Sequence, residues 1–122
     1  MSNQFDSAKG EPLQIIVGNQ LSSVEFVQDY VQLRFDGPSL TAITQPRVLI
    51  GDVLFEWGSP GYRDALCERI GKIVSAVALI EMQDIKIEFN DGSCVSISLR
   101  PADYRAAEAA IFRTEPDNTW VW

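Results

Sequence analysis

The sequence has no histidine and only two cysteines among its 122 residues. Without histidine, the chain cannot form a Ser-His-Asp or Cys-His catalytic arrangement, nor a histidine-ligated metal site. Two cysteines are also too few for a closed zinc site within one chain. Cys67 and Cys94 stand among apolar residues, so we expect free, buried thiols. We therefore expect no metal, no cofactor and no catalytic residues.

Basic residues are scarce as well. Ten lysines and arginines are scattered among seventeen aspartates and glutamates, which gives a formal net charge of −7. Binding to a phosphate backbone needs clustered cations, so we expect no nucleic-acid partner. An acidic surface instead suits a basic protein partner.

Long apolar runs are absent too. The sequence lacks the roughly 20 consecutive apolar residues of a membrane span, and its first residues do not resemble a secretory signal. We expect a cytoplasmic protein without membrane contact, with a disordered polar tail over residues 1–10 and a single domain over residues 11–122.

No glycine-rich phosphate loop is present, because the spacing of Gly51 and Gly58 matches neither the Walker nor the dinucleotide pattern. Asp52 and Glu56 lie four residues apart, but nothing in the sequence fixes their separation as acid–base chemistry requires. These observations argue against an enzyme.

What the sequence does contain is an internal repeat. Residues 18–35 and 71–89 align over most of their length, with one extra residue in the second copy. The matched pairs are Gly18 with Gly71, Leu21 with Val74, Ser22 with Ser75, Val24 with Val77, Phe26 with Leu79, Val31 with Ile85, Leu33 with Ile87 and Phe35 with Phe89. Repeat 1 spans about residues 18–70 and repeat 2 about residues 71–113, and a duplicated core typically folds as one unit.

Alternating apolar and polar residues predict a three-stranded meander in each copy. The predicted strands are residues 21–27, 31–35 and 40–43, then 77–80, 85–89 and 95–99. A helix is predicted after each meander, over 59–70 and 101–112. Ser59 is the expected N-cap of the first helix, and Gly71 its C-terminal cap. The fold class is therefore α+β, with duplicated β-β-β-α units. They share an antiparallel core that is either one curled sheet or a half-barrel, with two helices.

Residues 47–58 interrupt repeat 1 and have no counterpart in repeat 2. Gly51–Asp52 between apolar runs predicts a hairpin there. Phe55 and Trp57 suit a binding hot spot, or alternatively a cover for one end of the core. Outside the repeats, residues 13–17 and 120–122 are candidate strands.

Paired Tyr-Arg dipeptides supply the other candidate interaction residues. They are Tyr62, Arg63, Tyr104 and Arg105, with Arg100 nearby. Arginine binds carboxylates and phosphates well, so these side chains suit a small cationic patch. The alternative is that each arginine pairs with a neighbouring acid and each tyrosine packs into the core.

The run IEFNDGSCVSISLRPADYRAAEAAIF, residues 87–112, resembles a group of small uncharacterised bacterial proteins. They carry a D-G-S/T segment, then S-L-R-P-x-D-Y, then P-E-A-A. The matching residues here are Asp91–Gly92–Ser93, Ser98–Leu99–Arg100–Pro101, Asp103–Tyr104 and Glu108–Ala109–Ala110. Ala107 departs from the proline of that pattern. The resemblance implies no catalytic residues; some such proteins are suspected immunity or accessory factors of toxin systems.

Together these features predict a non-enzymatic protein-binding or accessory factor that self-associates as a homodimer through the insertion or a sheet edge. One alternative is a small-ligand-binding protein, with a pocket between sheet and helices near Tyr62, Arg100 and Tyr104. Another is an immunity-type inhibitor of a basic toxin.

Overall fold

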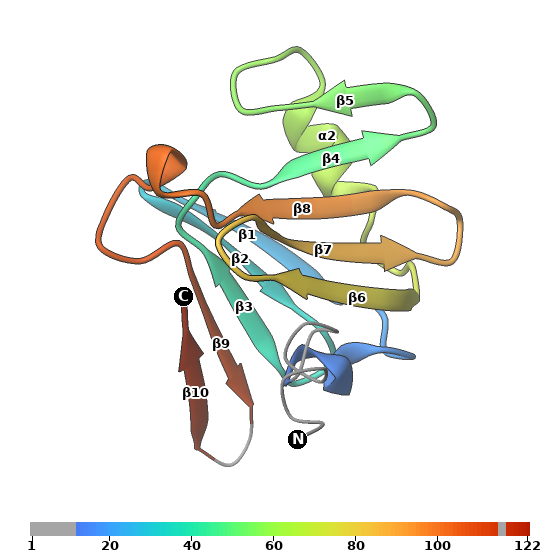
Figure 1. Cartoon of the computed structure of the whole chain (residues 1–122). Helices are drawn as coiled ribbons and strands as arrows, with labels where there is room; N and C mark the ends of the chain where they lie inside the picture. Colours follow the sequence, from blue (N-terminus) through green and yellow to red (C-terminus); the bar gives the residue numbers. More distant parts are fainter. Residues whose placement is uncertain (1–11, 115–116) are drawn as a thin grey trace.

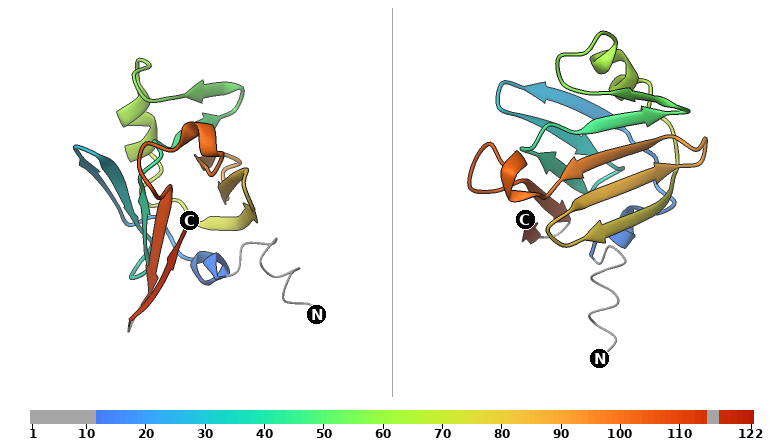
Figure 2. Two further views of the ribbon diagram at one scale, coloured as in Figure 1. Left: turned by 60° about the vertical axis from the view of Figure 1, so that its left-hand side comes forward. Right: turned by 45° about the horizontal axis from the view of Figure 1, so that its top comes forward.

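The computed structural model describes residues 12–114 and 117–122, and this part of the chain is mostly β-structure. Two antiparallel sheets of five strands each face one another (Figures 1 and 2). The first sheet has the order β1 (Ser23–Val27), β2 (Tyr30–Arg34), β3 (Ser39–Ala42), β9 (Ala110–Thr114), β10 (Asn118–Val121). The second has the order β5 (Val53–Phe55), β4 (Arg47–Ile50), β8 (Cys94–Ser98), β7 (Asp84–Phe89), β6 (Val74–Ile80).

Both predicted meanders are present, as β1–β3 and β6–β8, but they lie in different sheets. The single curled sheet or half-barrel was therefore the wrong architecture. Three short helices complete the described chain: α2 (Tyr62–Cys67), which is the α-helix, and the 3₁₀ helices η1 (Leu13–Ile16) and η2 (Pro101–Asp103). None of these described helices is long and apolar enough to cross a membrane.

Each meander is extended by a hairpin from the other half of the chain. Hairpin β4–β5 follows the first meander in sequence but pairs with β8, the last strand of the second. Hairpin β9–β10 follows the second meander but pairs with β3, the last strand of the first. The chain therefore crosses between the sheets twice, and each sheet contains strands from both halves (Figure 1).

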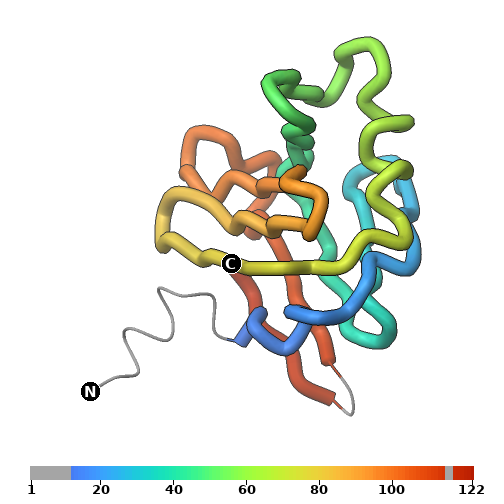
Figure 3. Tube along the Cα trace, turned by 90° about the vertical axis from the view of Figure 1, so that its right-hand side faces the viewer, coloured from blue at the N-terminus to red at the C-terminus, as the bar shows by residue number. Residues whose placement is uncertain are grey.

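The two meanders begin side by side at a short antiparallel junction, where the blue and yellow segments meet in Figure 3. Gln20 and Ile73 form an isolated β-bridge at its centre. Four N–H to C=O hydrogen bonds surround the bridge: Gly18 to Val74 (2.9 Å), Gly71 to Leu21 (2.8 Å), Val74 to Asn19 (2.8 Å) and Leu21 to Lys72 (3.0 Å). Gly18 and Gly71 have φ of 93° and 91°, values that glycine adopts without steric cost.

One hydrophobic core fills the space between the sheets. Its largest fully buried side chains include Phe35, Phe89 and Phe112, which come from both sheets. Strand β7 shows the expected alternation, because Ile85, Ile87 and Phe89 are buried while the intervening Lys86 and Glu88 are exposed. The core depends on residues from both repeats together.

The predicted second helix, residues 101–112, is absent. The chain instead forms η2, a loop, and then strand β9. Alanine and glutamate favour a helix locally, but Ala110 and Phe112 point into the core with no exposed surface. Strand β3 needs a hydrogen-bonding partner on this side, and β9 supplies it through the Ala42–Ala110 and Leu40–Phe112 pairs. Tertiary pairing thus overrides local propensity.

Other predictions near the helices also need correction. The first helix begins later than expected, with Gly61 as its N-cap, and Ser59 bonds the backbone of Glu56 instead. The candidate strand over residues 13–17 is instead η1 (Leu13–Ile16), and Cys67 is exposed although Cys94 is buried. The predicted tail, residues 1–10, lies outside the described residues.

Arg69, just beyond α2, is buried with 4% of its surface exposed. Its guanidinium donates to the Ala65 carbonyl (3.2 Å), to Ser93 Oγ and to Asp91 Oδ2 (3.0 Å). Asp91 also accepts hydrogen bonds from the backbone and side chain of Ser93. Chiefly the Ser93 hydroxyl, and also Arg69, lower the pKa of the Asp91 carboxyl. This network fixes the β7–β8 turn to the end of α2.

We expect Arg69→Met to destabilise the protein by about 2–3 kcal/mol, because Asp91 and Ser93 lose their buried donor while the side-chain volume is kept. Lys72→Met is the matched control, since Lys72 reaches the same carboxylate at 3.8 Å from a half-exposed position and contributes about 0–1 kcal/mol. Urea unfolding measures both; equal effects of the two substitutions would contradict the network.

Candidate functional site

The predicted insertion forms the β4–β5 hairpin, which projects at one end of the second sheet (Figure 1). Gly51 and Asp52 make its two-residue turn, and Gly51 has φ of 60°, as a type II′ turn requires at its first central position. Leu49 and Leu54 lie opposite each other across the hairpin and are 39% and 47% exposed. Exposed apolar side chains therefore gather on this hairpin, where Val53 and the following Trp57 are exposed as well.

Strand β5 is the outer strand of its sheet, so one side of its backbone has no neighbouring strand among the described residues. The residues that flank a two-residue turn form a hydrogen-bonded pair, and such pairs alternate along a hairpin. Ile50–Val53 is the flanking pair, so the N–H and C=O of Leu54 point away from β4. Leu54 thus presents a free backbone donor and acceptor at the open edge.

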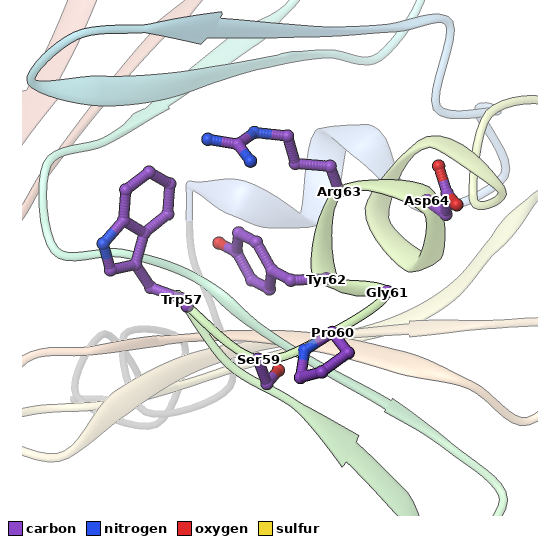
Figure 4. Close-up of a pocket in the computed structure, with 8 residues that line it drawn as sticks. Trp57, Ser59, Pro60, Gly61, Tyr62, Arg63 and Asp64 are labelled. Atoms are coloured by element: carbon purple, nitrogen blue, oxygen red, sulfur yellow. The ribbon is translucent and has the colours of Figure 1, made fainter.

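Behind the hairpin, Trp57, Tyr62 and Arg63 pack together around a pocket of about 380 Å³ lined by residues 57–64 (Figure 4). The Trp57 and Tyr62 rings meet edge to face, with centroids 5.9 Å apart. The Arg63 guanidinium lies 5.2 Å from the Trp57 ring centre and 5.9 Å from that of Phe26 on β1. These cation–π contacts join the insertion to the first sheet.

Tyr62 is a core residue, only 3% exposed, and its hydroxyl donates a 2.7 Å hydrogen bond to the Pro46 carbonyl. Burial raises the pKa of Tyr62 to about 12, and the nearby Arg63 charge opposes that shift only in part. The side chain therefore anchors α2 to the start of β4 and stays neutral at ordinary pH.

The remaining predicted residues lie in different surroundings. Phe55 and Tyr104 are half-buried and pack against the core, whereas Arg100 is exposed just before η2. Arg105 lines a second pocket, of about 240 Å³, and Trp57 lines this pocket as well. The structure thus brings Trp57, Tyr62 and Arg63 together and places Arg105 at a separate pocket that Trp57 also lines.

Sequence reasoning overlooked most residues of this second pocket. Besides Trp57 and Arg105 its walls are Thr44, Gln45, Arg47, Glu56, Ser98 and Asp103. One feature of the sequence could have indicated this pocket, namely the polar run Thr44–Gln45–Pro46–Arg47 between two strands. Loops on a rigid scaffold often carry functional residues.

The described residues contain no group of three or more histidine, cysteine, aspartate or glutamate side chains placed to hold a metal ion. No protein-family model matches this chain, and no curated protein or solved structure matches it significantly. The surface and pockets of the molecule itself are therefore what indicates its function.

Replacing Tyr62 by phenylalanine removes one buried hydrogen bond and leaves the Pro46 carbonyl without its donor. We expect Tyr62→Phe to cost about 1–2 kcal/mol at neutral pH. The folded pKa of about 12 lies above the ordinary 10.0, so the contribution of neutral Tyr62 is complete below pH 10.0 and is lost as the pH rises toward 12.

Ultraviolet titration of tyrosine ionisation checks this assignment. The step near pH 12 should be present in the native protein and missing in Tyr62→Phe. An unchanged titration curve in the variant would show that the buried phenol is not the late-ionising group.

Proposed function

We propose that this chain is a non-catalytic protein-binding factor that captures an extended, basic segment of a partner at the open edge of β5. The observation that carries the proposal is the exposed apolar strand β5, with the outward backbone groups of Leu54 at its centre. Adding a strand to a sheet edge supplies main-chain hydrogen bonds, while alternate side chains provide specificity.

The composition and surroundings of β5 set it apart from the other described edge strands. Strand β1 contains the exposed Glu25, and β10 contains the polar Asn118 and Thr119. Strand β6 has a bulge near Val74, and η1 covers it, because Gln14 Nε2 donates to the Val77 carbonyl. Every residue of β5 is apolar and its register with β4 shows no shift, so this strand lacks the charges and bulges that protect sheet edges.

Charge indicates which partner suits this edge. The exposed Asp52 and Glu56 directly flank β5, and the whole chain carries a net charge of −7. A partner strand with an apolar centre and a lysine or arginine at each end would place opposite charges across from these carboxylates.

Self-association at the same edge is the competing use of β5. A two-fold antiparallel pairing centred on Leu54 would join the Leu49–Leu54 pairs of two copies into one apolar stripe. It would also set Asp52 of one copy opposite Glu56 of the other, and these like charges repel. We therefore propose that any homodimer is weak and is strengthened by high salt, which screens that repulsion.

We further infer that the chain arose by duplication of a unit with a meander followed by a hairpin. The aligned repeats and the equivalent strand orders of the two sheets support this inference. So do the reciprocal hydrogen bonds of Gly18 and Gly71, each of which donates to the other copy.

Fluorescence anisotropy with two labelled peptides tests the proposed edge. Both have a centre of alternating valine and threonine; one has a lysine at each end and the other a glutamate. We expect the lysine peptide to bind at least about tenfold more tightly, a difference of about 1.4 kcal/mol. Leu54→Pro should abolish binding, because it removes the outward N–H.

Asp52→Lys/Glu56→Lys should reverse the preference of the protein between the two peptides. Asp29→Lys/Glu81→Lys is the matched control, since it makes the same charge change at exposed positions that do not flank β5. A reversal by the control as well would mean that net charge, not this edge, decides binding, and indifference of the native protein to both peptides would refute strand capture. Sedimentation of the native protein at low and high salt measures self-association separately.

A further inference from the structure

The pocket of about 240 Å³ lies where the loop between β3 and β4, the end of β5 and the η2 segment come together. Its volume falls just below the roughly 300–1,000 Å³ of pockets for drug-sized molecules. Its walls are polar and charged except for Trp57. Such a pocket suits a small, charged molecule.

Two side-chain oxygens that belong to its lining residues have no hydrogen-bond partner in the described structure. Thr44 Oγ1 and Gln45 Oε1 are buried side-chain atoms without a hydrogen bond, and Thr44 is only 6% exposed. The Thr44 backbone is held in place by a 3.0 Å bond from its N–H to the Ala109 carbonyl. An unsatisfied buried polar atom costs about 1–3 kcal/mol, so a donor from a bound molecule would stabilise this site.

The same pocket holds two arginines, Arg47 and Arg105. Neither makes an ion pair with an acid among residues 12–114 and 117–122. Asp103 lies in the pocket too, but its Oδ2 already accepts a 2.6 Å hydrogen bond from Ser98 Oγ. Among the described residues, those that line this cavity thus include two arginines without an ion-pair partner and two residues with an unpaired neutral oxygen.

We propose that this pocket binds a free α-amino acid. Its carboxylate would lie against the guanidinium groups of Arg47 and Arg105. On binding, the Thr44 and Gln45 side chains would turn so that Oγ1 and Oε1 accept hydrogen bonds from its ammonium group, with the Glu56 carboxylate nearby. An anion without an ammonium group would leave the two neutral acceptors without a donor, whereas a cation without a carboxylate would be repelled by the two arginines. A zwitterion carries both groups and so suits both parts of the pocket.

The test is thermal unfolding of the full chain with each of the common L-amino acids, with sodium acetate and methylammonium chloride as probes of each half of the zwitterion. We expect at least one amino acid to raise Tm by about 3 °C or more. Acetate and methylammonium at the same concentration should give clearly smaller shifts.

Titration calorimetry of the best amino acid then compares three variants. Thr44→Val and Arg105→Gln should each weaken binding about tenfold, while Arg100→Gln, an exposed arginine outside the proposed contacts, should leave the affinity unchanged. Without ligand, Thr44→Val should be as stable as the native protein or more so, since it removes an unsatisfied hydroxyl.

Three results would overturn the proposal: no amino acid shifts Tm, acetate alone gives the full shift, or Thr44→Val retains native affinity. In the first case, water would be the remaining partner for the two acceptors. Peptide capture at β5 does not depend on any of these outcomes, because its key groups are the backbone atoms of Leu54.

Discussion

The junction between residues 18–21 and 71–74 is the constraint on which the rest of the structure depends. At this point the first strands of the two meanders start from one antiparallel bridge, Gln20–Ile73, and then diverge into separate sheets. The two sheets are thereby held face to face, so their apolar sides can bury one another. Each sheet is completed by the hairpin of the other half, and neither half contains a whole sheet of its own. Cooperative folding of the entire described chain follows from this exchange.

The same arrangement explains where the candidate surfaces lie. Hairpin β4–β5 reaches its sheet from the other half of the chain, and in the described part of the chain no strand pairs with the outer side of β5. The connections that leave and enter this hairpin, together with η2, form the walls of both pockets beside Trp57. Structural and binding roles are thus divided among neighbouring residues: Tyr62 and Arg63 fix the hairpin to the core and to β1, whereas Leu54 and Arg105 face outward.

Much of the strand content could be predicted from the sequence, because alternation and turn residues are local signals. The β6–β8 meander and the Gly51–Asp52 turn are examples. The second helix was predicted wrongly because residues 104–110 favour a helix locally, while the strand that forms from Ala110 onward depends on β3, which is distant in sequence. The exchange of hairpins, the buried Arg69 and the polar pocket were not predictable for a related reason. Each depends on contacts between segments far apart in the chain, which no local pattern records.

Hydrogen exchange of the native full chain, followed residue by residue by NMR, tests the interlocked fold most directly. If the junction holds the two sheets together, the amides of Gly18, Leu21, Gly71 and Val74 should exchange only by global unfolding, with the same opening free energy as the amides of β3 and β8. Exchange of the four junction amides at a much lower free energy, while β3 and β8 remain protected, would contradict that account. It would mean that the sheets are held by core packing alone and that the junction is a peripheral contact.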